Sequence, residues 1–144
     1  MKTFVAVLFF SVLTAPQWLT DFSAAQSEAQ HQHKFILINF SGSDWCAPCI
    51  KMKKEVFETA SFDSLATEKL ILVRADFPRS SKNQLPKDQI KRNELLAEKY
   101  NPNGKFPYTV LTDAEGNVIR QWDGYAFGSQ ERFMSELEKS TSKH

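Results

Sequence analysis

The stretch FILINFSGSDWCAPCIKMKKEVF, residues 35–57, joins an apolar run to a helix-like segment through a short polar loop. Residues 35–40 are nearly all apolar and are rich in β-branched and aromatic types, as expected of a central strand buried on both faces. From Pro48 onward, apolar residues recur at helical spacing with charged residues between them. The stretch therefore predicts a strand, a loop and a helix, with Cys46 at the N-terminus of that helix.

The loop and the start of the helix contain the two cysteines of the chain, Cys46 and Cys49. Two thiols separated by two residues can close a small disulfide across the first turn of a helix. Neither can be tied into another bridge, because the chain has no third cysteine. The spacing predicts a redox dithiol that cycles between oxidised and reduced forms.

The position of each cysteine suggests its role. A thiolate rather than a thiol attacks a disulfide, and amides at a helix N-terminus favour the thiolate. We therefore predict that Cys46 is exposed and is the nucleophile, forming a mixed disulfide with a partner protein. Cys49, one turn further in and less exposed, then resolves that bond. Pro48 suits the first helical turn, where its missing N–H costs little.

The remaining pattern predicts a mixed, helix-covered sheet. Helical spacing is expected over residues 24–34, 62–67 and 90–100, and Ser129 is expected to cap a last helix. A second buried strand is expected over residues 70–75, followed by a polar loop over 77–87. Strands over 108–111 and 118–122 flank a turn and predict a closing antiparallel hairpin. The fold class is α/β.

Composition limits the function classes. With 144 residues, 42% apolar and 24% charged, the chain has room for one core. A formal net charge of +1 gives no electrostatic basis for binding nucleic acid. The three histidines, His31, His33 and His144, form no second ligand pair for the thiols, so we expect neither a metal nor a cofactor.

The first 25 residues read as a secretory signal peptide. Lys2 precedes an apolar run over residues 3–15, which is too short to span a membrane, and Ala25 suits a cleavage site before Gln26. The expected domain is then residues 26–144, exported across the inner membrane to the periplasm. Thiols there face an oxidising compartment, so a reducing role requires an electron donor, for which we expect a membrane protein.

The chain resembles the thioredoxin family in two motifs: Trp45-Cys46-Ala47-Pro48-Cys49 after a buried strand, and Phe106-Pro107-Tyr108-Thr109 before a hairpin. It is most similar to secreted bacterial members in which the helix runs on through a Lys-rich segment such as 51–57. The resemblance covers about residues 34–139. It implies the thioredoxin fold, with helices on both faces of the sheet.

The resemblance also implies the walls of the site. Pro107 would be cis and pack beside the dithiol, which leaves the backbone of Phe106 free to pair with an extended substrate. Trp45 would shield one flank, and Ala47 and Pro48 would complete the substrate-binding surface.

One position departs from the family pattern. Thioredoxins carry a buried aspartate in the strand before the motif, where this chain has Asn39. An asparagine cannot accept a proton at neutral pH, so water, Asp44 or another group must take that part. We expect Asn39 to tie the strand to the loop by hydrogen bonds.

These features predict a thiol–disulfide oxidoreductase that exchanges disulfides with extracytoplasmic proteins. Ala47-Pro48 lacks the histidine common between the cysteines of strongly oxidising relatives, which favours the reducing direction. The alternatives are a disulfide oxidase or isomerase, and a non-catalytic thioredoxin-fold adaptor or metallochaperone.

Overall fold

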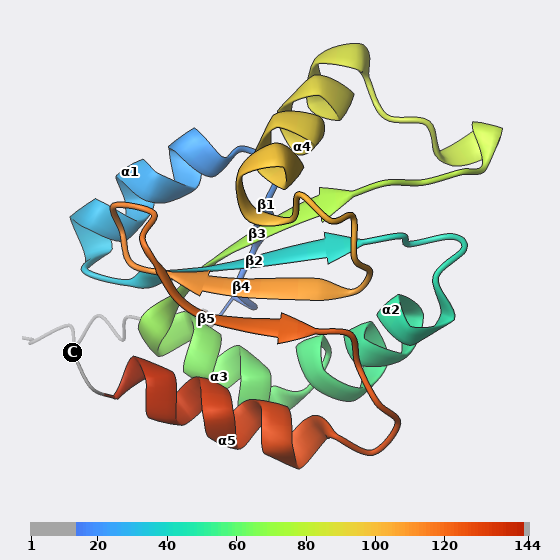
Figure 1. Ribbon diagram of the computed structural model, residues 1–144. Coiled ribbons are helices and arrows are strands. Elements are labelled where there is room, and N and C mark those ends of the chain that lie inside the picture. Colours follow the sequence, from blue (N-terminus) through green and yellow to red (C-terminus); the bar gives the residue numbers. More distant parts are fainter. Residues whose placement is uncertain (1–13, 143–144) are drawn as a thin grey trace, which may run out of the picture.

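The computed structural model describes residues 14–142, which form a five-stranded sheet in the order β1-β3-β2-β4-β5 (Figure 1). β2 and β3 are parallel, β2 and β4 are antiparallel, and β4 and β5 form the predicted hairpin. The strands are β1 (Trp18–Leu19), β2 (Phe35–Ser41), β3 (Leu70–Asp76), β4 (Tyr108–Thr112) and β5 (Val118–Asp123). The mixed sheet with a closing antiparallel hairpin is confirmed.

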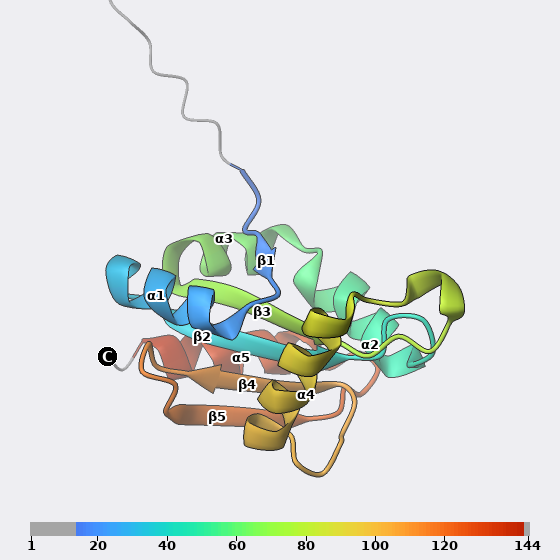
Figure 2. The same ribbon diagram turned by 90° about the horizontal axis from the view of Figure 1, so that it is seen from above.

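Helices cover both faces of this sheet (Figures 1 and 2). One face carries α1 (Phe22–Gln32) and α4 (Lys87–Tyr100); the other carries α2 (Ala47–Met52), the π-helical turn η1 (Lys53–Phe57), α3 (Ala60–Lys69) and α5 (Gln130–Thr141). No helix among residues 14–142 combines the length and the apolar character that crossing a membrane requires.

The central strand is buried on both faces, as its apolar run predicts. In β2, Ile36, Ile38 and Phe40 join the core beneath α1 and α4, whereas Leu37 joins the core beneath α2, α3 and α5. Alternate side chains of a strand point to opposite faces, so one apolar run supplies both cores. The end of β2, where the dithiol loop begins, is thus held rigidly.

The fold begins earlier in the chain than residue 26. β1 pairs in parallel with β3, and α1 starts at Phe22, so the expected junction between Ala25 and Gln26 lies inside α1. Ala25 is fully buried in the core. The folded domain therefore includes residues that the sequence pattern assigned to the leader, while residues 3–13 of the apolar run expected over 3–15 lie outside the described residues.

The helix after the dithiol changes its hydrogen bonding within its length. It is α-helical from Ala47 to Met52 and π-helical from Lys53 to Phe57. Ser129 is the N-cap residue of α5, as expected. Its side chain makes no cap hydrogen bond, because the hydroxyl donates to the Ala126 carbonyl instead.

Candidate functional site

Cys46 and Cys49 form a disulfide at the start of α2, with an S–S distance of 2.14 Å and a Cα–Cα distance of 5.2 Å. The expected difference in exposure is absent in this oxidised form, since the two residues are 5% and 4% exposed. Ala47 and Pro48, between them, are exposed.

The helix start gives the Cys46 sulfur a polar partner. Cys46 is the N-cap residue of α2, and the Cys49 amide donates to its Sγ at 3.3 Å. Pro48 lies within the first turn, as predicted. Because that amide has no partner within the helix, it is free to stabilise a thiolate on Cys46 when the bond is reduced.

The loop between β2 and α2 is anchored to the end of β3. The amides of Trp45 and Cys46 donate to the Gly42 carbonyl at 3.3 and 2.9 Å. The Ser43 amide donates to Asp76 Oδ1 at 2.9 Å and its hydroxyl donates to Oδ2 at 2.5 Å. These hydrogen bonds fix the position of the loop, and with it the position of the dithiol at the start of α2.

The Phe106–Pro107 peptide bond is cis, as the family resemblance implies. Pro107 is buried, and its carbonyl accepts a hydrogen bond from the Gly124 amide at 2.9 Å. Among the described residues, the Phe106 backbone makes no hydrogen bond. The half-buried Phe106 ring packs edge-on against Trp45, with ring centroids 5.4 Å apart.

Asn39 is 3% exposed, and its amide donates to Thr109 Oγ1 at 3.1 Å. It therefore ties β2 to β4, which corrects the expected link to the loop. No residue supplies a carboxylate hydrogen-bonded to either cysteine within the part of the chain described.

Asp44 has a different use from proton transfer. Its carboxylate accepts hydrogen bonds from the Arg79 and Ser80 amides, each at 2.9 Å, and from Asn83 Nδ2 at 3.0 Å. The Arg79 amide, then the Asn83 side chain and the Ser80 amide, lower the pKa of Asp44. Its ionised carboxylate clamps the loop after β3 to the dithiol loop.

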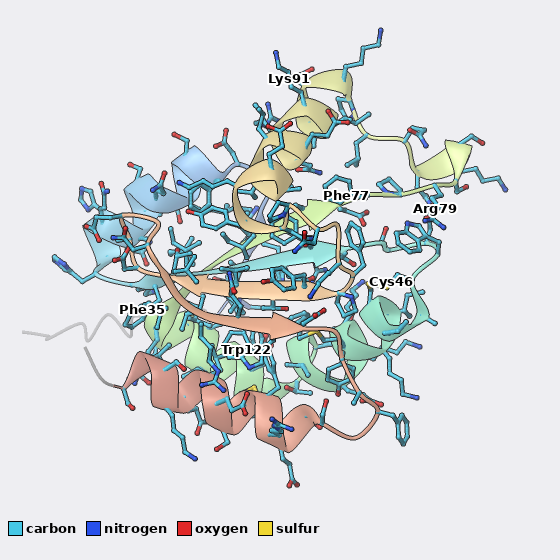
Figure 3. The ribbon with its side chains drawn as sticks, viewed as in Figure 1. Phe35, Cys46, Phe77, Arg79, Lys91 and Trp122 are labelled. Atoms are coloured by element: carbon cyan, nitrogen blue, oxygen red, sulfur yellow. A yellow bond between two sulfur atoms is a disulfide. The ribbon has the colours of Figure 1, made fainter. Side chains whose placement is uncertain are left out.

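This clamp brings two residues to the site that the sequence pattern did not assign to it, Phe77 and Arg79 (Figure 3). The Phe77 ring packs edge-on against Phe106 with centroids 5.4 Å apart, and its carbonyl accepts a hydrogen bond from Trp45 Nε1 at 2.7 Å. The Arg79 guanidinium carbon lies 3.7 Å from the centre of the Trp45 ring. The only sequence signal was the unusual length of the polar loop.

Comparison with known proteins places this geometry among redox proteins. The chain matches the thioredoxin-like domain family over residues 22–141. It is 33% identical over 124 residues to the disulfide bond reductase DsbH of Chlamydia pneumoniae, covering 86% of this chain and 72% of DsbH. It is 30% identical over 103 residues to the thioredoxin-related protein DsbJ of the same organism, covering 71% of this chain but 28% of DsbJ.

Solved structures of other redox proteins share the fold of this chain. A DsbH oxidoreductase matches with a TM-score of 0.80 and 27% identity, covering 99% of this chain and 96% of that chain. A disulphide isomerase from Xylella fastidiosa Temecula1 matches with a TM-score of 0.58 and 16% identity, covering 81% and 88% of the two chains. The second likeness is one of fold alone.

Proposed function

This chain belongs to the thioredoxin-like domain family, and we propose that within it the protein reduces disulfide bonds of other proteins. Family membership and the Cys46–Cys49 pair make it a thiol–disulfide oxidoreductase. The observation that carries the proposed chemistry is the disulfide at the N-terminus of α2, with the Cys49 amide directed at the Cys46 sulfur.

The reaction assigns one step to each cysteine. In the reduced protein, the Cys46 thiolate attacks one sulfur of the substrate disulfide, which breaks that bond and releases the other sulfur as a thiolate. The Cys49 thiolate then attacks Cys46 Sγ and releases the second substrate sulfur. The substrate gains two electrons and two protons, and the protein ends as the Cys46–Cys49 disulfide that the structure contains.

Cys49 must lose a proton before it attacks. Asn39 has no acidic proton acceptor to offer, and the Asp44 carboxylate is committed to the loop after β3. We assign the proton to water reaching the exposed Ala47-Pro48 edge, or to the departing substrate thiolate.

The substrate is expected to lie as an extended segment beside Pro107. The unpaired backbone of Phe106 can hydrogen-bond to such a segment while its sulfur faces Cys46. Trp45, Ala47 and Pro48 form the rest of the contact surface, since the first is half-buried and the other two are exposed.

Two observations support the reducing direction. No histidine lies between the cysteines, and the relative DsbH is named a disulfide bond reductase. A reductant in an oxidising compartment needs a supply of electrons, so we propose a membrane protein as donor and an apolar leader, residues 3–15, that directs export to the periplasm.

The roles of the cysteines are tested with a model protein disulfide such as that of insulin. We expect Cys46→Ser to abolish reduction, and Cys49→Ser to accumulate a covalent complex that dithiothreitol releases. Because both variants remove one thiol, each controls for the other. Full turnover by Cys46→Ser would refute the assignment of the nucleophile.

The direction is tested by equilibrating the dithiol with glutathione. A potential near the roughly −270 mV of thioredoxin supports a reductant, whereas one near about −120 mV identifies an oxidase. Stoichiometric copper binding without any disulfide exchange would instead identify an adaptor or metallochaperone.

A further inference from the structure

We propose that Arg79, stacked on Trp45, is a specificity-determining residue that favours protein substrates with an acidic side chain close to the reacting cysteine. This inference rests on the proposed function, because it concerns the substrate of the same dithiol. It adds a cationic subsite, on the loop over residues 77–83, to the walls formed by Trp45 and Phe106.

The subsite is held in place by the chain itself. Asp44 lies two residues before Cys46. Its carboxylate accepts hydrogen bonds from the backbone amides of Arg79 and Ser80 and from the side-chain amide of Asn83. The Trp45 indole donates to the Phe77 carbonyl at the start of the same loop. The loop is therefore fastened to the dithiol segment at both ends, and Arg79 has a defined position relative to Cys46.

The positive charge of the loop forms no ion pair with the part of the chain that the structure describes. Among residues 14–142, neither Arg79 nor Lys82 forms an ion pair, although both are exposed. The nearby carboxylates are engaged elsewhere: Asp44 with the loop amides, and Asp76 with Ser43 and the Phe77 amide. A carboxylate arriving with the substrate would meet an exposed guanidinium that is not already engaged in an ion pair with a described residue.

The distances suit a residue near the substrate cysteine. Arg79 lies 3.7 Å from the Trp45 ring, and Trp45 is the immediate neighbour of Cys46. An extended substrate advances about 3.3 Å per residue. We therefore place the favoured aspartate or glutamate one to three residues from the reacting sulfur, with the substrate backbone running along Phe106.

Figure 3 supports the choice of a control. Phe77 and Arg79 lie on the same side of the molecule as Cys46, whereas Lys91 projects from α4 away from the dithiol. Lys91 is exposed and forms no ion pair among the described residues. Lys91→Gln removes the same charge from the protein as Arg79→Gln without touching the site.

The test uses three disulfide-containing peptides that differ only in a glutamate, glutamine or lysine two residues from the cysteine. Second-order rate constants for their reduction are measured with wild type, Arg79→Gln and Lys91→Gln. We expect wild type and Lys91→Gln to prefer glutamate over glutamine by about two- to five-fold, the range of an exposed ion pair. Lysine should be the slowest, and 0.5 M salt should reduce the preference.

In Arg79→Gln the preference should disappear, so that the glutamate, glutamine and lysine peptides are reduced at rates equal to one another. Equal rates for glutamate and glutamine in wild type, or an undiminished preference in Arg79→Gln, would overturn the subsite. Failure of wild type to reduce any peptide would instead overturn the proposed function, so the two failures are distinguishable.

Discussion

Asn39 occupies the buried position where the family pattern places an aspartate, and its surroundings fit an amide. The side chain is nearly inaccessible, and its amide donates to the Thr109 hydroxyl. An ionised carboxylate there would lose this donor and carry the cost of burying an unpaired charge. The residue thus links two strands beneath the dithiol, and proton transfer must take another route.

Gly42 is needed because the Trp45 indole covers it. A Cβ on Gly42 would lie 2.3 Å from Trp45 Cε2 and 2.7 Å from Nε1, closer than atoms can approach. We predict that Gly42→Ala displaces the indole, breaks its hydrogen bond to Phe77 and lowers the free energy of unfolding by about 1–3 kcal/mol, measured by urea denaturation.

A double-mutant cycle isolates this contact. Trp45→Ala removes the ring that would clash, so Gly42→Ala should cost less free energy in that background than in wild type. Additive effects of the two substitutions would contradict the steric explanation.

The segment before residue 26 belongs to the folded domain. Trp18 in β1 stacks on Phe62, meets Phe57 edge-on and lies beneath the Arg74 guanidinium. Asp21 caps α1, because its carboxylate accepts hydrogen bonds from the Ser23 and Ala24 amides. Removal of this segment would uncover parts of both cores.

We predict that a chain starting at Gln26 is less stable than one starting at Thr14 by at least about 3 kcal/mol, since it lacks the aromatic contacts of Trp18 and Phe22. Urea denaturation of the two chains measures the difference. A third chain starting at Gln17 keeps β1 and should match the longer one. Equal stabilities for the Gln26 and Thr14 chains would show that the segment is dispensable.

Tyr125 connects the loop after β5 to η1, because its hydroxyl donates to Glu55 Oε2 at 2.6 Å. Burial, followed by the hydrogen bond to Glu55, raises the pKa of Tyr125 to about 12. A raised pKa means that the folded state holds this proton more tightly than the unfolded state. The resulting stabilisation is complete below about pH 10, the ordinary tyrosine value, and is lost as the pH rises through about 12.

We expect an absorbance titration at about 295 nm to show one tyrosine ionising late, and Tyr125→Phe to remove that phase. Tyr125→Phe should also flatten the loss of stability above pH 10. A late phase that persists in the variant would assign it to a different tyrosine.

In the molecule as a whole, the two cores and the dithiol are separate. The cores lie on opposite faces of the sheet and are built from aliphatic and aromatic side chains of β2, β3, β4 and the helices. Neither core cluster contains Cys46 or Cys49. The redox state of the pair can therefore change while the fold is maintained.

We predict that the Cys46→Ser/Cys49→Ser double variant keeps the far-ultraviolet circular dichroism of wild type and still unfolds cooperatively. It should lose no more than about 2 kcal/mol, because a cross-link that closes so short a loop removes little entropy from the unfolded chain. Calorimetry of the oxidised, reduced and double-variant proteins measures this. Loss of cooperative unfolding would show that the disulfide is structural.

The larger elements and the place of the dithiol could be predicted from the amino-acid sequence. Strands β2 and β3, the hairpin and the helices α1, α4 and α5 follow from apolar periodicity, which is a local property. Cys46 and Cys49 could be identified from their spacing, and Pro107 from the resemblance of its motif to that of the thioredoxin family. Strand β1 was not predicted, because a strand of two residues is too short to show an alternation of apolar and polar side chains. The π-helical turn η1 was not predicted either, because it leaves the helical spacing of apolar residues almost unchanged.

The groups that surround the dithiol, by contrast, depend on tertiary contacts. Asp44 accepts a hydrogen bond from the loop after β3, Asn39 donates to Thr109, and Arg79 lies over Trp45. These contacts join residues that are 34 to 70 positions apart in the chain. Hydrogen bonds and ring contacts at such separations depend on how strands and loops meet, which no local pattern encodes.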